Sequence, residues 1–129
     1  MAVDRFFRRA LLATGLLNLF GAVLLAPPAV ALRVLTGLPE AGHPLYPWCL
    51  SLWILFFGIG YLRLAVSAAH ERFFVAIGAA GKASFSLLLV SYWLAGDLPF
   101  RAALAGSADL GFAAVFVYWL RATRAQPAP

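Results

Sequence analysis

The sequence predicts an all-α integral membrane protein, a four-helix up-down bundle with a short interfacial helix in its first outer loop. Two features of the composition support this prediction: 64% of the 129 residues are apolar, and only 12% are charged. An ordinary soluble domain is about half apolar and about a quarter charged, so this chain cannot build a water-facing surface all round. Its apolar residues also come in long runs, as in segments that cross a bilayer. At this length we expect a single transmembrane domain.

Four apolar runs are long enough to cross the membrane, because a helix needs about 20 residues to span about 30 Å of hydrocarbon. We expect the spans at about residues 7–26, 48–69, 73–95 and 100–120. Pro27 and Pro28 end the first span, since proline lacks the amide hydrogen that would continue the helix. The apolar stretch 29–38 is too short to cross, and we expect it to form a helix at the outer surface. The short later loops predict that consecutive spans are antiparallel neighbours.

The basic residues predict the orientation, because cytoplasmic loops retain Lys and Arg. With four spans, one side of the membrane holds Arg5, Arg8, Arg9, Arg72, Arg121 and Arg124, and the other holds Arg33 and Arg101. This six-to-two division predicts that both termini are cytoplasmic. The first run, preceded by arginines, also resembles a secretory signal peptide. We expect it to remain as an uncleaved first helix.

Polar side chains within the spans predict a buried polar layer. Counted from the cytoplasmic side, Lys82 lies about 13 Å into the third span and Asp109 about 16 Å into the fourth. Charges at such depth are rare and usually face the bundle interior. We therefore predict an ion pair between Lys82 and Asp109, with Asn18 at the same depth and Arg63 at the edge of the layer.

Small residues at helical spacing accompany these side chains and predict the faces on which the helices meet. The four stripes are Gly15, Asn18 and Ala22; Gly60, Arg63 and Ser67; Gly78, Lys82 and Ser86; and Ala102, Ala105, Asp109 and Ala113.

Two interpretations of the polar layer stay open. In the structural one, Asn18, Lys82 and Asp109 hold the helices in register, and Arg63 extends to lipid phosphate. In the functional one, the layer binds a ligand. Two cations against one carboxylate would then favour an anionic or carbonyl-bearing molecule, such as a quinone, a pigment or a bound lipid.

The sequence contains no constellation typical of an enzyme. The serines of the third span lack a histidine at their depth, so a hydrolase triad cannot be assembled. Glu40, His43 and Cys49 lie near one another in the chain, but their spacing is not that of metal ligands. There is no charged tail of the kind that binds nucleic acid. The lipid bilayer is therefore the first partner to expect, with other membrane-protein subunits as further candidates.

Several short motifs suggest a family. They are Leu35-Thr36-Gly37-Leu38-Pro39, Pro44-Leu45-Tyr46, Gly58-Ile59-Gly60-Tyr61, Arg72 with Gly78, Gly81 and Lys82, and Asp109 with Phe112. In these motifs the chain resembles the small, largely uncharacterised four-span membrane proteins of bacteria that are broadly DoxX-like. The resemblance implies a four-helix bundle in the bacterial inner membrane. It implies no activity, because such proteins are mostly unassigned or are accessory subunits of membrane redox systems.

These features together favour a non-catalytic membrane protein, either an accessory or stabilising subunit of a larger membrane complex or a binder of a lipophilic ligand. The main alternative is a small transporter or proton-conducting protein that uses the buried Lys82/Asp109 pair. A membrane enzyme is a third, weaker hypothesis.

Overall fold

A computed structural model describes residues 2–40, 42–67 and 71–124 of the chain. Every regular element in these ranges is helical, which confirms the all-α class. The elements are α1 (Ala2–Leu25), a 3-10 turn η1 (Pro27–Ala29), α2 (Val30–Thr36), α3 (Leu45–Val66), α4 (Arg72–Leu94), α5 (Phe100–Ala105) and α6 (Ser107–Ala122). Four stretches are long and apolar enough to cross a membrane: Asp4–Leu25, Leu45–Val66, Arg72–Leu94 and Phe100–Ala122. The expected end of the second span, at residues 68 and 69, lies outside the described residues.

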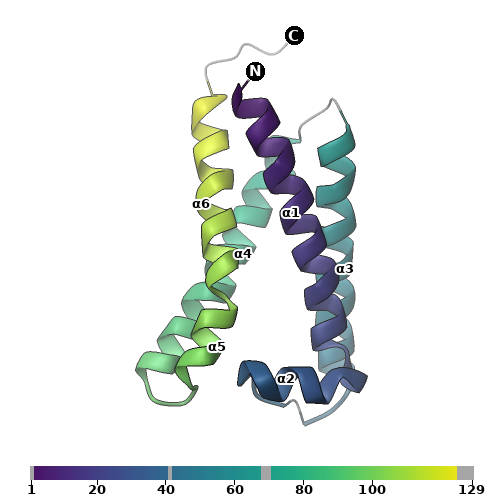
Figure 1. Ribbon diagram of the computed structural model, residues 1–129, viewed down its shortest axis with the longest axis vertical. Helices are drawn as coiled ribbons and strands as arrows, with labels where there is room; N and C mark the ends of the chain where they lie inside the picture. Colours follow the sequence, from purple (N-terminus) through teal and green to yellow (C-terminus); the bar gives the residue numbers. More distant parts are fainter. Residues whose placement is uncertain (1, 41, 68–70, 125–129) are drawn as a thin grey trace.

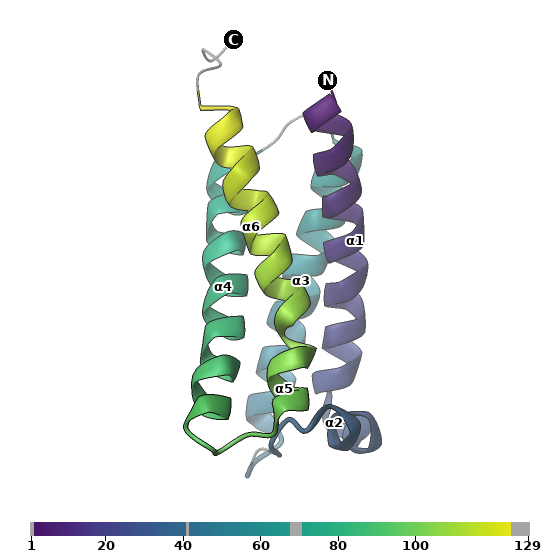
Figure 2. The ribbon, with the colours of Figure 1, turned by 60° about the vertical axis from the view of Figure 1, so that its left-hand side comes forward.

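The bundle consists of two helix pairs, α1 with α3 and α4 with α6 (Figures 1 and 2). The pairs are joined at the end of the molecule where α1 begins and α6 ends, and they diverge toward α2 (Figure 1). The expectation that the third and fourth spans are neighbours is confirmed by the pairing of α4 with α6. The second and third spans, α3 and α4, contact each other through side chains, with few close backbone contacts. The ring of Phe74 on α4 lies between them and packs on Gly60, Phe57 and Tyr61 of α3.

Small residues explain why α1 prefers α3. A Cβ atom added at Gly58 would lie 2.9 Å from Cβ of Asn18 and 3.3 Å from the carbonyl oxygen of Gly15. A Cβ atom at Gly15 would lie 2.6 Å from the side chain of Leu62. Close approach of two backbones at glycine is the usual way in which helices pack without water.

An aromatic core closes the end where the two helix pairs join. Phe7 of α1 stacks on Trp119 of α6, with ring centroids 4.3 Å apart, and meets Phe116 edge to face at 6.0 Å. Tyr61 of α3 and Val75 of α4 complete this core, so that every long helix contributes to it. Phe7, Tyr61, Val75 and Phe116 are almost fully buried.

The fourth span, expected as one helix over residues 100–120, is interrupted. Gly106 separates α5 from α6, and Asp109 therefore stands in the first turn of α6. A Cβ atom at Gly106 would lie 2.5 Å from the Leu89 side chain on α4. The Gly106-Ser107 pair accounts for the break, because such pairs are common positions of helix kinks.

Helix α2 crosses the end of the bundle opposite the termini (Figures 1 and 2). With η1 it corresponds to the short helix expected at residues 29–38. Gly37 ends α2 with a φ of 73°, a left-handed conformation that glycine adopts without strain. A Cβ atom here would also lie 2.6 Å from the ring of Pro99. Glycine thus lets α2 turn and lets the chain pass close to the start of α5.

Candidate functional site

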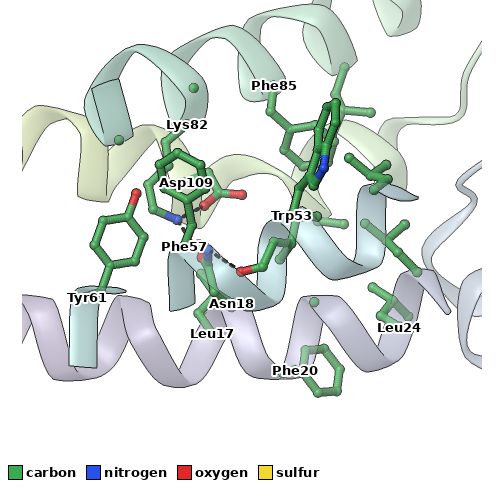
Figure 3. A pocket seen from close by; sticks show the side chains of 18 of the residues that line it. Leu17, Asn18, Phe20, Leu24, Trp53, Phe57, Tyr61, Lys82, Phe85 and Asp109 are labelled. Carbon is green, nitrogen blue, oxygen red and sulfur yellow. Dashed lines mark hydrogen bonds and ion pairs between the residues drawn. The ribbon is translucent and has the colours of Figure 1, made fainter. Parts of the chain in front are cut away.

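Three of the four side chains that the sequence placed in a polar layer meet in the middle of the bundle (Figure 3). Lys82 Nζ lies 2.5 Å from Asp109 Oδ1. The same ammonium donates a hydrogen bond to Asn18 Oδ1 at 2.9 Å. Asn18 Nδ2 in turn donates to the carbonyl oxygen of Ile54 at 3.2 Å. The ion pair predicted from depth is therefore present, and the network connects all four spans.

The surroundings of Lys82 keep its charge away from lipid. Its side chain is only 7% exposed, whereas that of Asp109 is 20% exposed. The ammonium also lies 5.5 Å from the centre of the Tyr61 ring and 5.8 Å from that of Phe112. Aromatic faces attract a cation at this range, most strongly where water is excluded.

The buried stripes of α1 and α4 are as expected. Asn18 follows Gly15 by one helical turn, and Lys82 lies one turn from both Gly78 and Ser86, all of them buried. On the last span Ala102 and Ala113 are buried, whereas Ala105 is exposed beside the cavity described below.

The structure does not bring Arg63 to this cluster. Its side chain is exposed on α3, and it has no hydrogen bond or ion pair with Asn18, Lys82 or Asp109. The expectation that Gly60, Arg63 and Ser67 form the inward stripe of this span is wrong, because the buried residues of α3 are Ser51, Gly58, Tyr61, Leu64 and Ala65. The polar layer consequently holds one cation and one carboxylate, and its net charge is zero rather than positive.

A cavity of about 310 Å³ lies beside the network, in the region where the two helix pairs diverge (Figure 3). Phe20, Trp53, Phe57 and Phe85 form aromatic parts of its wall, and leucines from α1, α3 and α4 form much of the rest. Asn18, Lys82 and Asp109 line one side. Binding sites for small molecules commonly combine apolar walls with a few convergent polar groups.

The cavity extends from the polar layer toward α2. Leu24 and Leu25 at the end of α1, and Leu38 just after α2, are among its lining residues. Trp53 also lines it, and 66% of this residue is exposed. The cavity is thus open to the surroundings of the bundle rather than fully enclosed.

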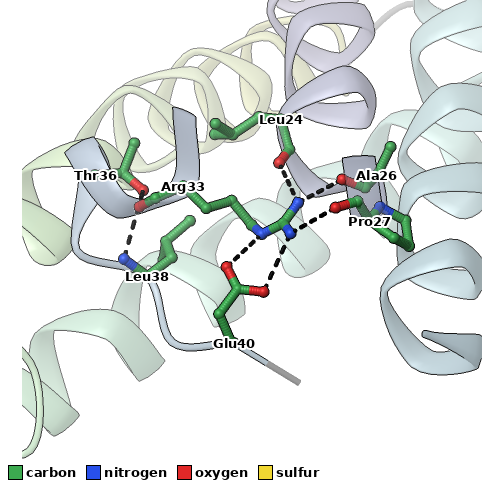
Figure 4. A network of polar contacts seen from close by, with 7 residues as sticks. All are labelled: Leu24, Ala26, Pro27, Arg33, Thr36, Leu38 and Glu40. Carbon is green, nitrogen blue, oxygen red and sulfur yellow. Dashed lines mark hydrogen bonds and ion pairs between the residues drawn. The ribbon is translucent and has the colours of Figure 1, made fainter. Parts of the chain in front are cut away.

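A second buried charge, Arg33, was not recognised from the sequence. It is only 4% exposed and joins α2 to the end of α1 (Figure 4). Its guanidinium donates to the carbonyl oxygens of Leu24 and Pro27, each at 3.0 Å, and also to that of Ala26. Its Nε and Nη2 atoms donate to the two carboxylate oxygens of Glu40, at 2.9 and 3.1 Å.

Arg33 supplies donors that the end of α1 lacks. The last carbonyls of a helix have no partners within the helix, and the two prolines after α1 cannot donate. A lone arginine in an otherwise apolar stretch, seven residues before a glutamate, is the signal that could have revealed this contact. The hydrogen bond from Arg33 lowers the pKa of Glu40.

Two further arginines act at helix ends beside the aromatic core. Arg8 donates to the carbonyl oxygen of Ala65 at 2.8 Å, near the end of α3. Arg72 donates to that of Leu120 at 2.6 Å, near the end of α6, and its guanidinium lies 5.5 Å from the centre of the Trp119 ring. Positive charge is favourable at the carboxyl end of a helix. The residues that predicted the orientation thus also fasten the helices to one another.

Comparison of the chain with protein-family models, with curated proteins and with solved structures gave no match. The resemblance to the DoxX-like group therefore stays a prediction.

Proposed function

We propose that this is a non-catalytic membrane protein that binds a neutral lipophilic molecule in the cavity between its two helix pairs. The observation that carries the proposal is the cavity of about 310 Å³, apolar and aromatic on most sides and bordered by a buried ion pair on one. An engineered apolar cavity of about 150 Å³ accepts benzene. A volume about twice as large suits a ring with a short substituent, or the ring of a longer molecule whose chain continues into lipid.

The charge of the polar layer supports a neutral ligand. The Lys82 ammonium and the Asp109 carboxylate form an ion pair, so the net charge of the pair is zero. An anionic headgroup would then gain no net attraction, although it would lose its hydration on entering the cavity. Of the candidate ligands named from the sequence, a quinone, a neutral pigment or a lipid with an uncharged headgroup fits this layer, and a phosphate-bearing lipid fits it poorly.

The bacterial inner membrane, with both termini cytoplasmic, is the location that we propose. The distribution of arginines supports it, because α1 begins and α6 ends at the same end of the bundle as Arg8 and Arg72 (Figure 1). In this orientation the cavity lies in the outer half of the membrane. The exposed face of Trp53 gives it a border with lipid, from which a lipophilic molecule could enter without crossing water.

Transport by the Lys82/Asp109 pair is a less favoured alternative. A proton or ion pathway would need water to reach the pair from both sides. The aromatic core of Phe7, Tyr61, Phe116 and Trp119 is packed between the pair and the end of the bundle where the termini lie. A subunit role in a larger complex is compatible with ligand binding, and so is membership of the DoxX-like group.

Two glycines provide a matched test of the proposal. Gly81 of α4 lines the cavity, and a Cβ atom there would meet no atom within 4 Å. Gly111 of α6 has equally open surroundings but does not line the cavity. Leucine at either position should improve helix propensity by roughly 0.8–1 kcal/mol, whereas only Gly81→Leu should fill part of the cavity.

The experiment is purification of the three proteins from the same native membrane, followed by mass spectrometry of the lipophilic molecules that remain bound. We expect one compound to accompany the wild-type protein and Gly111→Leu in near-stoichiometric amount, and to be reduced at least tenfold in Gly81→Leu. Equal amounts in all three preparations would overturn the proposal. A protein that accompanies all three in fixed ratio, without any such compound, would instead favour a purely accessory role.

A further inference from the structure

We infer that the cavity selects a neutral headgroup that donates a hydrogen bond, namely a hydroxyl such as that of a phenol or an alcohol. This inference rests on the proposed function and adds the chemical class of the ligand. It is based on a difference between Asp109, whose carboxylate has a free acceptor atom, and Lys82, whose ammonium already has partners.

One carboxylate oxygen of Asp109 remains available. Oδ1 is in contact with Lys82 at 2.5 Å, whereas Oδ2 accepts no hydrogen bond from the part of the chain that the structure describes. Asp109 lines the cavity, and its second oxygen points away from Lys82 toward the side of Trp53 and Phe85 (Figure 3). An ionised carboxylate accepts hydrogen bonds but donates none. The cavity therefore presents a charged acceptor.

The ammonium of Lys82, in contrast, already donates most of its hydrogens to neighbouring groups. Of its three hydrogens, one is directed to Asp109 and one to Asn18. The rings of Tyr61 and Phe112 lie beside it, and its side chain is less exposed than that of Asp109. Hydrogen bonds to charged groups are stronger than those between neutral groups. Among the polar groups that line the cavity, Asp109 therefore gains most from a further hydrogen bond. A ligand that donates a hydrogen bond to its second oxygen supplies it.

The same geometry disfavours other headgroups. A carboxylate or phosphate would place like charge next to the free oxygen of Asp109. An ether, an ester or an oxidised quinone, which only accepts hydrogen bonds, would leave that oxygen without a partner, which is costly. Of the neutral ligands proposed above, those that carry a hydroxyl therefore fit best. The aromatic walls formed by Phe57 and Phe85 suit a ring that carries the hydroxyl, since aromatic pairs are favourable beyond the area that they bury.

The experiment uses three probes with the same ring and chain: para-pentylphenol, para-pentylanisole and para-pentylbenzoate. Each is titrated by calorimetry against the delipidated full-length protein in nanodiscs. The signal of interest is the saturable component that Gly81→Leu lacks and Gly111→Leu retains, because partition into lipid is common to all samples. We expect saturable binding of the phenol, at least tenfold weaker binding of the anisole, and none of the benzoate.

A double variant tests the role of Asp109 without leaving a lone buried charge. In Lys82→Met with Asp109→Leu, the phenol and the anisole should bind with similar affinity, because the charged acceptor is gone while the cavity remains. Equal affinities in the wild-type protein, or tightest binding of the benzoate, would overturn the inference but leave a ligand-binding cavity. Absence of saturable binding for all three probes would overturn both the inference and the proposed function.

Discussion

At the contact between Lys82 and Asp109, loss of one partner and loss of both have different consequences. A single change leaves an uncompensated charge in the bundle interior, which typically costs 3–5 kcal/mol, whereas apolar replacement of a whole buried pair is often neutral. We expect Lys82→Met to lower the free energy of unfolding by about 3 kcal/mol. The double variant Lys82→Met with Asp109→Leu should lie within about 1 kcal/mol of the wild-type protein.

Reversible unfolding in mixed micelles measures these differences. Lys82→Met, Asp109→Leu and the double variant form a double-mutant cycle with the wild-type protein, in which close residues show non-additive effects. If the double variant were as unstable as the sum of the two single variants, the pair would not stabilise the bundle as a unit.

The contact between Arg33 and Glu40 should make the docking of α2 depend on pH. Its pKa lies below the ordinary value of 4.5 in the folded protein, chiefly because of the hydrogen bond from Arg33. A carboxyl group whose pKa is lower in the folded state stabilises that state at any pH above its pKa in the unfolded chain. This contribution is lost as the pH falls through the pKa of the folded state. We therefore expect α2 to stay docked between pH 8 and pH 5 and to loosen below about pH 4.5.

Hydrogen exchange of the α2 amides, corrected for the intrinsic effect of pH, measures this docking. In Glu40→Gln the acidic step should disappear, and exchange should be faster at neutral pH as well. If exchange of the α2 amides still increased below about pH 4.5 in that variant, a group other than Glu40 would be responsible.

At the scale of the elements, the packing of α1 on α3 depends on Gly58. A side chain there meets Cβ of Asn18, which is fixed to the backbone and cannot rotate away. Overpacking of this kind typically costs 1–3 kcal/mol. We expect Gly58→Val to lower the free energy of unfolding by about 2 kcal/mol and to loosen the hydrogen bond between Asn18 and Lys82.

Gly111→Val is the matched control, because a Cβ atom at Gly111 meets open space. It should alter stability by less than about 0.5 kcal/mol, as surface substitutions usually do. Thermal unfolding of both variants in the same detergent provides the comparison. Equal losses would mean that valine itself, rather than the contact with α1, is responsible.

At the scale of the whole molecule, the helices could be predicted from sequence because a bilayer of fixed thickness demands apolar runs of fixed length. The Lys82–Asp109 pair could be predicted because depth follows from the rise per residue. The inward face of α3 could not be predicted, because this helix is apolar on nearly all sides and Arg63 is its only charged residue. The pairing of α4 with α6 could be predicted from the short loop between them. The extent of the contact between α1 and α3 could not, because it depends on contacts such as that of Gly58 with Asn18.

The orientation of the whole bundle gives the last prediction. In a background of Cys49→Ser, a cysteine is introduced at Gly42, in the exposed loop before α3, or at Arg124, exposed just after α6. The two positions lie at opposite ends of the bundle. If the arginine-rich end is cytoplasmic, a membrane-impermeant maleimide should label Gly42→Cys in intact spheroplasts and should label Arg124→Cys only after permeabilisation. The reverse pattern would place the cavity in the inner half of the membrane, and its ligand would then enter from the cytoplasmic leaflet.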